Sequence, residues 1–245
     1  SDGCNEVWLT STDNGCYGLD IGSDLPELVN AVSEIDKQFF IRVGMMNPMY
    51  MPKIRDGLLK SFESSKVFKF LHVPVQSGSN QVLNDMKRGH TEQTFRDITQ
   101  KFRKKFDKFT ISTDIIVGFP TETEEDFEQT LKLLEETKPD IVNLSRYSQR
   151  PGTDAAEMNQ IDVIEVKRRS KIAYELINKI SEENNRNWIG WEGQVTFDEE
   201  HEGQIRGRNF AYKPIFVKEK PRIGQISNVK IIDTTTHSLI GQIMS

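Results

Sequence analysis

The stretch Ser112–Phe127, STDIIVGFPTETEEDF, is the most informative part of the sequence. Its β-branched residues up to Val117 predict a strand that runs into the turn Gly118-Phe119-Pro120. A helix is expected to follow Thr123, because Thr123 and Asp126 have capping-box spacing and acidic residues suit the positive end of a helix dipole. A strand, a tight turn and a helix start in this order place Gly118 and exposed backbone amides where a ligand can approach closely.

Similar units of a strand followed by a helix occupy the rest of the first 188 residues. Five consecutive units with mostly apolar strands predict an α/β fold with a parallel sheet, either curled into a partial barrel or doubly wound. The strands are expected at Glu6–Thr10, Phe39–Gly44, Val67–Val73, Thr110–Val117 and Ile141–Ser145. The helices are expected from Asp24 onward and at Ile54–Phe62, Gln81–Met86, Glu92–Phe106, Glu124–Thr137 and Val163–Trp188.

The pattern changes to short alternating strands from Gly190 onward. Glycines and polar turns separate five such runs, which predicts a small all-β barrel. The strands are expected at Gly193–Phe197, Gly203–Arg208, Lys213–Val217, Gln225–Ile232 and Ser238–Ile243. We therefore predict two domains, 1–188 and 189–245.

The overall composition bounds the possible functions. The net charge of -5 gives no general attraction to nucleic acid, so any RNA contact must rest on a local patch. No apolar run approaches the ~20 residues of a membrane span, and no signal peptide is visible, so a cytoplasmic protein is expected. The cysteines, Cys4 and Cys16, lie too far apart for a metal motif, and the histidines are scattered. We therefore predict no metal site in this chain, and each histidine is expected to be a surface or hydrogen-bonded residue.

Polar residues at the ends of the expected strands form the candidate binding site. The carboxyl ends of parallel barrel strands share one rim, where ligands bind. Polar groups, a glycine and a ring there suit a ligand with a ribose, a charged amino-acid end and an adenine. Turn residues of these types are also common without any ligand, and that alternative stays open. The candidates are Asp13, Arg42, Gln76, Ser77, Asp114, Gly118 and Phe119; no catalytic residue is assigned.

A second candidate site lies in the expected C-terminal barrel. The run Gly207–Pro214, GRNFAYKP, combines cations, an amide and aromatic rings on one turn. Cations hold phosphates and aromatic rings stack on unpaired bases, although a solvated hairpin has the same composition. The candidate RNA-binding residues are Arg206, Arg208, Asn209, Phe210, Tyr212 and Lys213.

Four motifs together resemble one family. The runs HVPVQSGS (His72–Ser79), MKRGHT (Met86–Thr91), STDIIVGFPTETEEDF and SQRPGT (Ser148–Thr153) are similar, in order and spacing, to the radical S-adenosylmethionine methylthiotransferases. The C-terminal barrel resembles their TRAM domain, an RNA-binding module. The runs TSTDNGCYG and GRNFAYKPIFV look most like the archaeal and eukaryotic branch, which methylthiolates threonylcarbamoyladenosine next to the anticodon of tRNA.

The resemblance implies a cofactor, partners and a mechanism. It implies a partial barrel of six strand-helix units, two [4Fe–4S] clusters, a 5′-deoxyadenosyl radical, a sulfur donor, and sulfur insertion at carbon 2 of the base. Asp114, Arg42, Gln76 and Ser77 would then hold S-adenosylmethionine, and Ile116–Phe119 would contact its adenine.

The chain departs from the family pattern at its start. The family's CxxxCxxC cluster loop follows the first barrel strand, and its second cluster lies on an N-terminal domain. Only five units are found here, and neither cysteine occupies a motif position. We therefore expect a fragment that lacks the first strand and cluster loop, binds no cluster and does not catalyse by itself. The alternatives are a methylthiotransferase for a ribosomal protein or for isopentenyladenosine in tRNA, and a non-catalytic RNA-binding protein.

Overall fold

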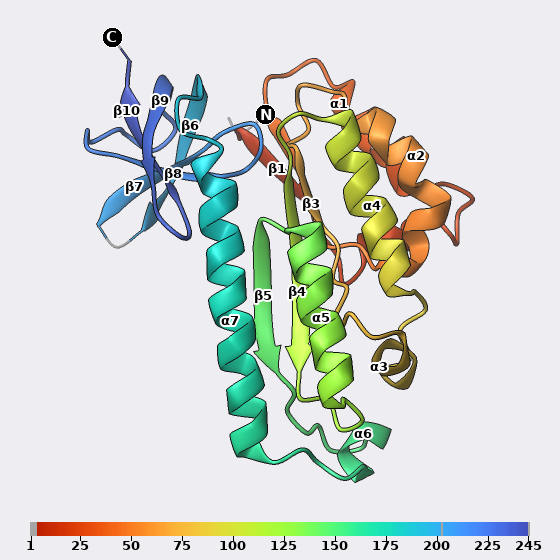
Figure 1. Ribbon diagram of the computed structural model, residues 1–245. Helices are drawn as coiled ribbons and strands as arrows, with labels where there is room; N and C mark the ends of the chain where they lie inside the picture. Colours follow the sequence, from red (N-terminus) through yellow and green to blue (C-terminus); the bar gives the residue numbers. More distant parts are fainter. Residues whose placement is uncertain (1–3, 202, 245) are drawn as a thin grey trace.

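The computed structural model describes residues 4–201 and 203–244, which form an α/β domain and a closed β barrel (Figure 1). The α/β domain contains five strands: β1 (Glu6–Leu9), β2 (Phe40–Val43), β3 (Phe70–His72), β4 (Thr110–Val117) and β5 (Ile141–Arg146). Its helices are α1 (Leu25–Ser33), α2 (Met51–Ser61), α3 (Asn80–Asp85), α4 (Glu92–Lys105), α5 (Glu124–Thr137), α6 (Asp154–Glu157) and α7 (Val163–Arg186), with short 3-10 turns η1 (Asn14–Cys16) and η2 (Pro48–Tyr50).

Each strand of the α/β domain runs parallel to the next one along the chain. β1 pairs with β2, and β3, β4 and β5 pair in that order, while Ile41 bridges to Val67 and links the two sheets. The helices α1, α2, α4, α5 and α7 contact one another in sequence, so they form one layer (Figure 1). Sequential strands with helices in one layer confirm the partial barrel and exclude the doubly wound arrangement.

The expected strand Val67–Val73 is shorter in the structure, and the reason is a change of partner. The backbone around Val67 bonds to β2, where Ile41 donates to the Lys66 carbonyl at 2.7 Å and Phe68 donates to the Ile41 carbonyl at 3.0 Å. Pairing with β4 begins only at Phe70. This segment therefore joins the two sheets before β3 proper starts.

Alternate residues of β4 point to opposite sides of the sheet. Ile111, Ile115 and Val117 belong to the apolar core beneath the helices, whereas Asp114 and Ile116 line a cavity on the other side.

The helix after β4 begins as predicted. The Thr123 hydroxyl accepts from the Asp126 amide at 3.2 Å, and the Asp126 carboxylate accepts from the Thr123 amide at 3.0 Å.

The C-terminal barrel closes through five strands in the order β10-β8-β7-β6-β9. These are β6 (Glu192–His201), β7 (Gln204–Arg208), β8 (Pro214–Val217), β9 (Ile226–Thr234) and β10 (Leu239–Ile243). Its core includes Trp188, Phe197 and Ile215. α7 ends at Arg186 and β6 begins at Glu192, so the expected domain boundary at 188/189 lies in the short connection between them.

The turn between β7 and β8 attaches the barrel to the α/β domain. The Tyr212 ring lies 4.9 Å from the Phe68 ring and 5.2 Å from the Phe70 ring. The Lys213 ammonium contacts the Asp140 carboxylate at 2.9 Å and the Asn185 side-chain oxygen at 3.1 Å. The two domains are therefore packed together through apolar and charged contacts.

Within the described ranges, no helix has the length and apolar character needed to cross a membrane.

Candidate active site at the carboxyl end of the strands

A cavity of about 640 Å³ opens on the inner side of β4 and β5, towards their carboxyl ends. Parallel barrels bind ligands at this end, because the loops that leave the strands meet there. Side chains of four kinds line the cavity: acidic, basic, amide and aromatic. They include Gln76, Met86, Arg88, Asp114, Phe119, Asn143, Tyr147 and Arg150.

Asp114 is the acidic group of this cavity. Its Oδ1 accepts hydrogen bonds from His72 Nε2 at 3.0 Å and from Asn143 Nδ2 at 2.7 Å. Burial raises the pKa of Asp114, but the bonds from His72 and Asn143 and the nearby charges of His72 and Arg88 outweigh it, so the pKa lies below its usual value. Asp114 is therefore a fixed carboxylate at neutral pH, suited to hydroxyl groups or a cationic amine.

Gln76 and Arg88 complete the polar lining. Gln76 has a left-handed backbone with φ of 75°, and its amide donates to the Asp114 carbonyl at 2.8 Å. A left-handed conformation is uncommon outside glycine, and here it turns the chain beside β4. Burial lowers the pKa of Arg88, and its Nε is buried without a hydrogen-bond partner among the described residues. The cavity thus contains polar groups that a ligand can satisfy.

The Gly118-Phe119 turn differs from the expectation in one respect. The Gly118 amide is not open to a ligand, because it donates to Glu122 Oε1 at 2.9 Å. Glu122 in turn forms a buried ion pair with Arg169 of α7 at 2.8 Å. Glycine is required here because φ is +78° and a Cβ would lie 2.6 Å from the Val166 side chain. Gly118 itself lines a neighbouring cavity of about 410 Å³.

Phe119 places an aromatic wall on the main cavity. Its ring meets the Tyr147 ring edge-on, with centroids 5.4 Å apart. Both rings line the cavity beside Ile116, as a flat apolar ligand such as a purine would require. The structure therefore brings Gln76, Asp114 and Phe119 together.

Three other predicted cofactor residues lie outside that cavity. Asp13 accepts the amides of Gly15 at 2.8 Å and Asn47 at 3.0 Å, so its carboxylate caps a turn. Ser77 is buried against the Thr130 hydroxyl, 3.3 Å away. These contacts supply the partners that a polar group needs inside a protein, and they account for both residues without a ligand.

Arg42, the third of them, lies among aromatic rings. Its guanidinium is 4.8 Å from the Trp8 ring, 5.0 Å from the Phe70 ring and 5.2 Å from the Tyr212 ring. Cations are attracted to the faces of such rings. Arg42 thus partners a ring from the C-terminal barrel, and it helps to join the two domains.

The sequence interpretation missed His72 and Asn143 as members of the site. Asn143 lies opposite Asp114 in the register of β4 and β5, and His72 lies on β3 next to Ser112. Alternation along each strand puts all three on the inner face. The alternation along each strand was visible in the sequence and could have indicated these residues. Which residues of neighbouring strands lie side by side, however, is set by the register of the folded sheet.

The predicted RNA-binding turn is largely an internal contact. Asn209, Tyr212 and Lys213 are only 1%, 7% and 2% exposed. The Asn209 side chain accepts the amides of Ala211 and Lys213, and burial raises the pKa of Tyr212 to about 12. Tyr212 and Lys213 pack against the α/β domain, and Asn209 is bonded within its own turn, so none of the three side chains faces solvent. RNA binding by these residues stays a prediction.

The remaining residues of that turn have partners of their own. Arg206 forms an ion pair with Glu199, and the Arg208 guanidinium lies 3.7 Å from the same carboxylate and 4.5 Å from the Tyr212 ring. The Phe210 ring packs 6.0 Å from Trp188. These side chains are partly buried, so the turn as a whole offers less free cationic surface than its composition indicates.

The two cysteines are free, and Cys16 donates to the Asp13 carbonyl at 3.2 Å. In the part of the chain that the structure describes, no group of three or more His, Cys, Asp and Glu side chains is arranged to hold a metal ion.

Comparisons with known proteins agree with this architecture. The model of the Radical SAM superfamily matches residues 1–134, and the model of the TRAM domain matches residues 193–244. In structure the chain is similar to coproporphyrinogen III oxidase from Escherichia coli, a radical SAM enzyme. The TM-score is 0.50 at 15% identity, with 89% of this chain and 55% of that chain covered. This likeness supports the fold.

Similarity in sequence extends along nearly the whole chain. It is 45% identical over 244 residues to the probable threonylcarbamoyladenosine tRNA methylthiotransferase of Archaeoglobus fulgidus, covering 98% of this chain and 57% of that protein. It is 37% identical over 248 residues to the threonylcarbamoyladenosine tRNA methylthiotransferase of Drosophila melanogaster, covering 100% of this chain and 45% of that protein. The chain thus spans about half the length of these curated relatives.

Proposed function

Since the chain belongs to the Radical SAM superfamily, we propose that it is part of a tRNA methylthiotransferase that acts on threonylcarbamoyladenosine next to the anticodon. The observation that carries this proposal is the identity of 37% to 45% with relatives of that name across almost all of the chain. The TRAM match supports RNA as the substrate. We expect a cytoplasmic enzyme that also needs a sulfur donor.

The cavity beside β4 suits S-adenosylmethionine. Its ionised Asp114 can accept from ribose hydroxyls or from the ligand's ammonium group, and the rings of Phe119 and Tyr147 can hold an adenine. Arg88 lines the same cavity and adds a cation that can pair with the ligand's carboxylate. When bound, the cofactor supplies the radical chemistry for sulfur insertion at carbon 2 of the base.

The residues of this chain would bind and orient the reactants. His72 and Asn143 fix the Asp114 carboxylate through bonds of 3.0 and 2.7 Å, so that it does not have to reorganise when the ligand arrives. The Glu122–Arg169 pair holds the turn that carries Phe119. A preformed pocket of this kind reduces the ordering cost of binding.

The test is the nucleoside composition of tRNA. The complete gene product, expressed in a strain that lacks its own threonylcarbamoyladenosine methylthiotransferase, should restore the methylthio derivative, measured by mass spectrometry of digested tRNA. Asp114→Asn should lose most of this product, whereas Asp97→Asn, at an exposed position on α4, should retain it. A methylthio group found on isopentenyladenosine or on a ribosomal protein, or no product at all, would contradict the proposed reaction.

A further inference from the structure

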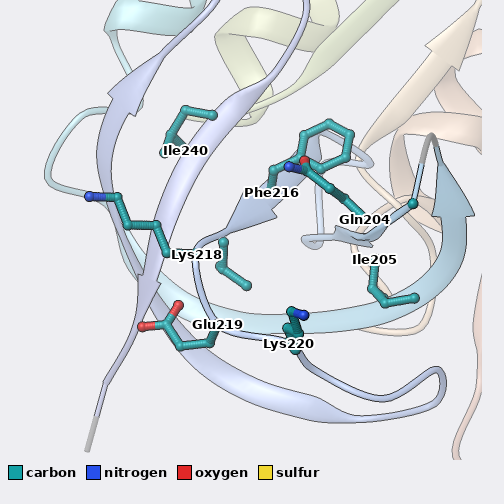
Figure 2. A pocket seen from close by; sticks show the side chains of 9 residues that line it. Gln204, Ile205, Phe216, Lys218, Glu219, Lys220 and Ile240 are labelled. Atoms are coloured by element: carbon teal, nitrogen blue, oxygen red, sulfur yellow. The ribbon is translucent and has the colours of Figure 1, made fainter.

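The outward face of the C-terminal barrel carries a second hollow, of about 510 Å³. It lies over β7, β8 and β10 and is shown in Figure 2. On its floor, Phe216 of β8 pairs with Ile240 of β10 and with Arg206 of β7. The neighbouring Ile215 points into the barrel core, so Phe216 points outward by strand alternation. The floor is thus an aromatic ring on a sheet surface.

Three charged side chains line this hollow, the two lysines Lys218 and Lys220 and the glutamate Glu219 (Figure 2). Lys218 and Lys220 follow β8, line the hollow and are exposed (Figure 2). Within the described residues, neither lysine side chain forms a hydrogen bond or an ion pair. The other cations of the barrel differ in this respect, because most are paired: Arg206 and Arg208 with Glu199, Lys213 with Asp140 and Lys230 with Glu192.

We propose that this face binds a single-stranded segment of the substrate RNA, with one base against Phe216 and phosphates at Lys218 and Lys220. This inference rests on the proposed tRNA substrate and specifies where the barrel holds it. The hollow combines an aromatic ring with two unpaired lysines against one glutamate, Glu219. This combination suits unpaired nucleotides, because rings stack on bases and cations neutralise phosphates. Lysine is depleted at protein–protein interfaces, which favours RNA over a protein partner. Gln204 and Ile205 supply an amide and an apolar edge to the same hollow.

The neighbouring turn, in contrast, is engaged by the α/β domain. Tyr212 and Lys213 hold the barrel on the α/β domain, so they fix its orientation. The hollow lies on the outward side of β8, one strand residue away from the buried Ile215. The barrel can therefore bind RNA on its outer face while the turn stays docked.

The first test labels lysines without changing the sequence. The chain is acetylated with and without a synthetic anticodon stem-loop, and the labelled positions are read by mass spectrometry. We expect Lys218 and Lys220 to be protected by the stem-loop, and Lys230, an exposed lysine on β9 outside the hollow, to react as before. Protection by a purified, RNA-free ribosomal protein and not by the stem-loop would overturn the assignment to RNA.

The second test measures affinity at several salt concentrations. The double variant Lys218→Gln/Lys220→Gln should lower the slope of log affinity against log salt by about 1.4, or ~0.7 per phosphate contact in single-stranded RNA. Phe216→Ala should weaken binding about 5- to 150-fold with little change in slope, and Phe216→Tyr should bind like the parent because it keeps a stacking ring. Lys230→Gln is the matched charge control.

The outcomes separate the two proposals. If the parent binds the stem-loop and these variants bind equally well, the face is assigned wrongly while the tRNA substrate stands. If the parent binds no stem-loop, this inference and the proposed RNA substrate fail together. Circular dichroism of each variant distinguishes loss of binding from loss of folding. The exposed lysine pair serves as the decisive variant if Phe216→Ala does not fold.

Discussion

Replacing Lys213 by methionine should destabilise the protein and loosen the contact between its two domains. Methionine keeps the apolar stem of lysine but removes the ammonium that bonds to Asp140 at 2.9 Å and to Asn185 at 3.1 Å. Lys213 is 2% exposed, and only 8% of the Asp140 side chain is exposed. The substitution therefore leaves a buried carboxylate without its closest cation.

The expected magnitude follows from what Asp140 retains. Removing one partner of a buried ion pair costs about 3–5 kcal/mol. Asp140 still accepts from the Ile111 amide at 3.0 Å and lies 3.6 Å from Arg103, so we expect the lower end, about 3 kcal/mol. For a chain of this size, that loss corresponds to a fall in melting temperature of about 6–12 °C.

Calorimetry or urea unfolding of the purified chain measures the effect, and Lys230→Met is the matched control. Lys230 belongs to the same barrel and pairs with Glu192 at 2.7 Å, but both side chains are about half exposed, so its loss should cost about 0–1 kcal/mol. The double variant Lys213→Met/Asp140→Leu should recover part of the lost stability, because no charge is then left buried. Equal stability of Lys213→Met and Lys230→Met would refute the reasoning.

Three further outcomes are expected. Asp114→Asn should weaken S-adenosylmethionine binding in titration calorimetry, and an unchanged affinity would show that the site is assigned wrongly. Binding by the parent should persist at neutral pH and decline only when acid protonates Asp114, because the pKa of this carboxyl is lowered. Gly118→Ala should destabilise more than Gly152→Ala in thermal unfolding, since both residues have φ near +80° but only at Gly118 would the Cβ meet Val166; equal losses would contradict that packing effect. Burial raises the pKa of Asp198 to about 6, so between about pH 4 and 6 the folded state binds more protons than the unfolded state. The contribution of Asp198 to stability therefore declines as pH rises through this range. Asp198→Asn should flatten the pH dependence of the unfolding free energy, and the same pH dependence in variant and parent would argue against this reasoning.

Local patterns in the sequence were sufficient to predict the elements around β4. The strand Thr110–Val117 and the helix Glu124–Thr137 have the predicted bounds, because β-branched residues and a capping box act over a few neighbouring residues. Asp114 was predicted on the same basis, as a polar residue inside an apolar strand. Its hydrogen-bond partners were not, because they depend on the register between separate strands.

The turn after β7 shows the opposite case. Cations and rings on a turn suit an RNA surface and a contact between domains equally well. Only the folded chain brings Tyr212 to Phe68 and Phe70, and Lys213 to Asp140. These contacts join residues more than 70 positions apart, and no short pattern records such a distance. Composition indicated a cluster of cations and rings on one turn of the barrel, but not which of those side chains face solvent.

The long helix α7 gives the two domains a mechanical connection. Near its start, Arg169 holds Glu122 and through it the turn beside the cavity, and near its end, Asn185 donates to the carbonyls of Thr235 and Thr236 in the barrel. Its 24 residues span about 36 Å. One continuous helix therefore contacts both the barrel and the turn that carries Phe119, so the position of the barrel and the shape of the cavity wall depend on the same element.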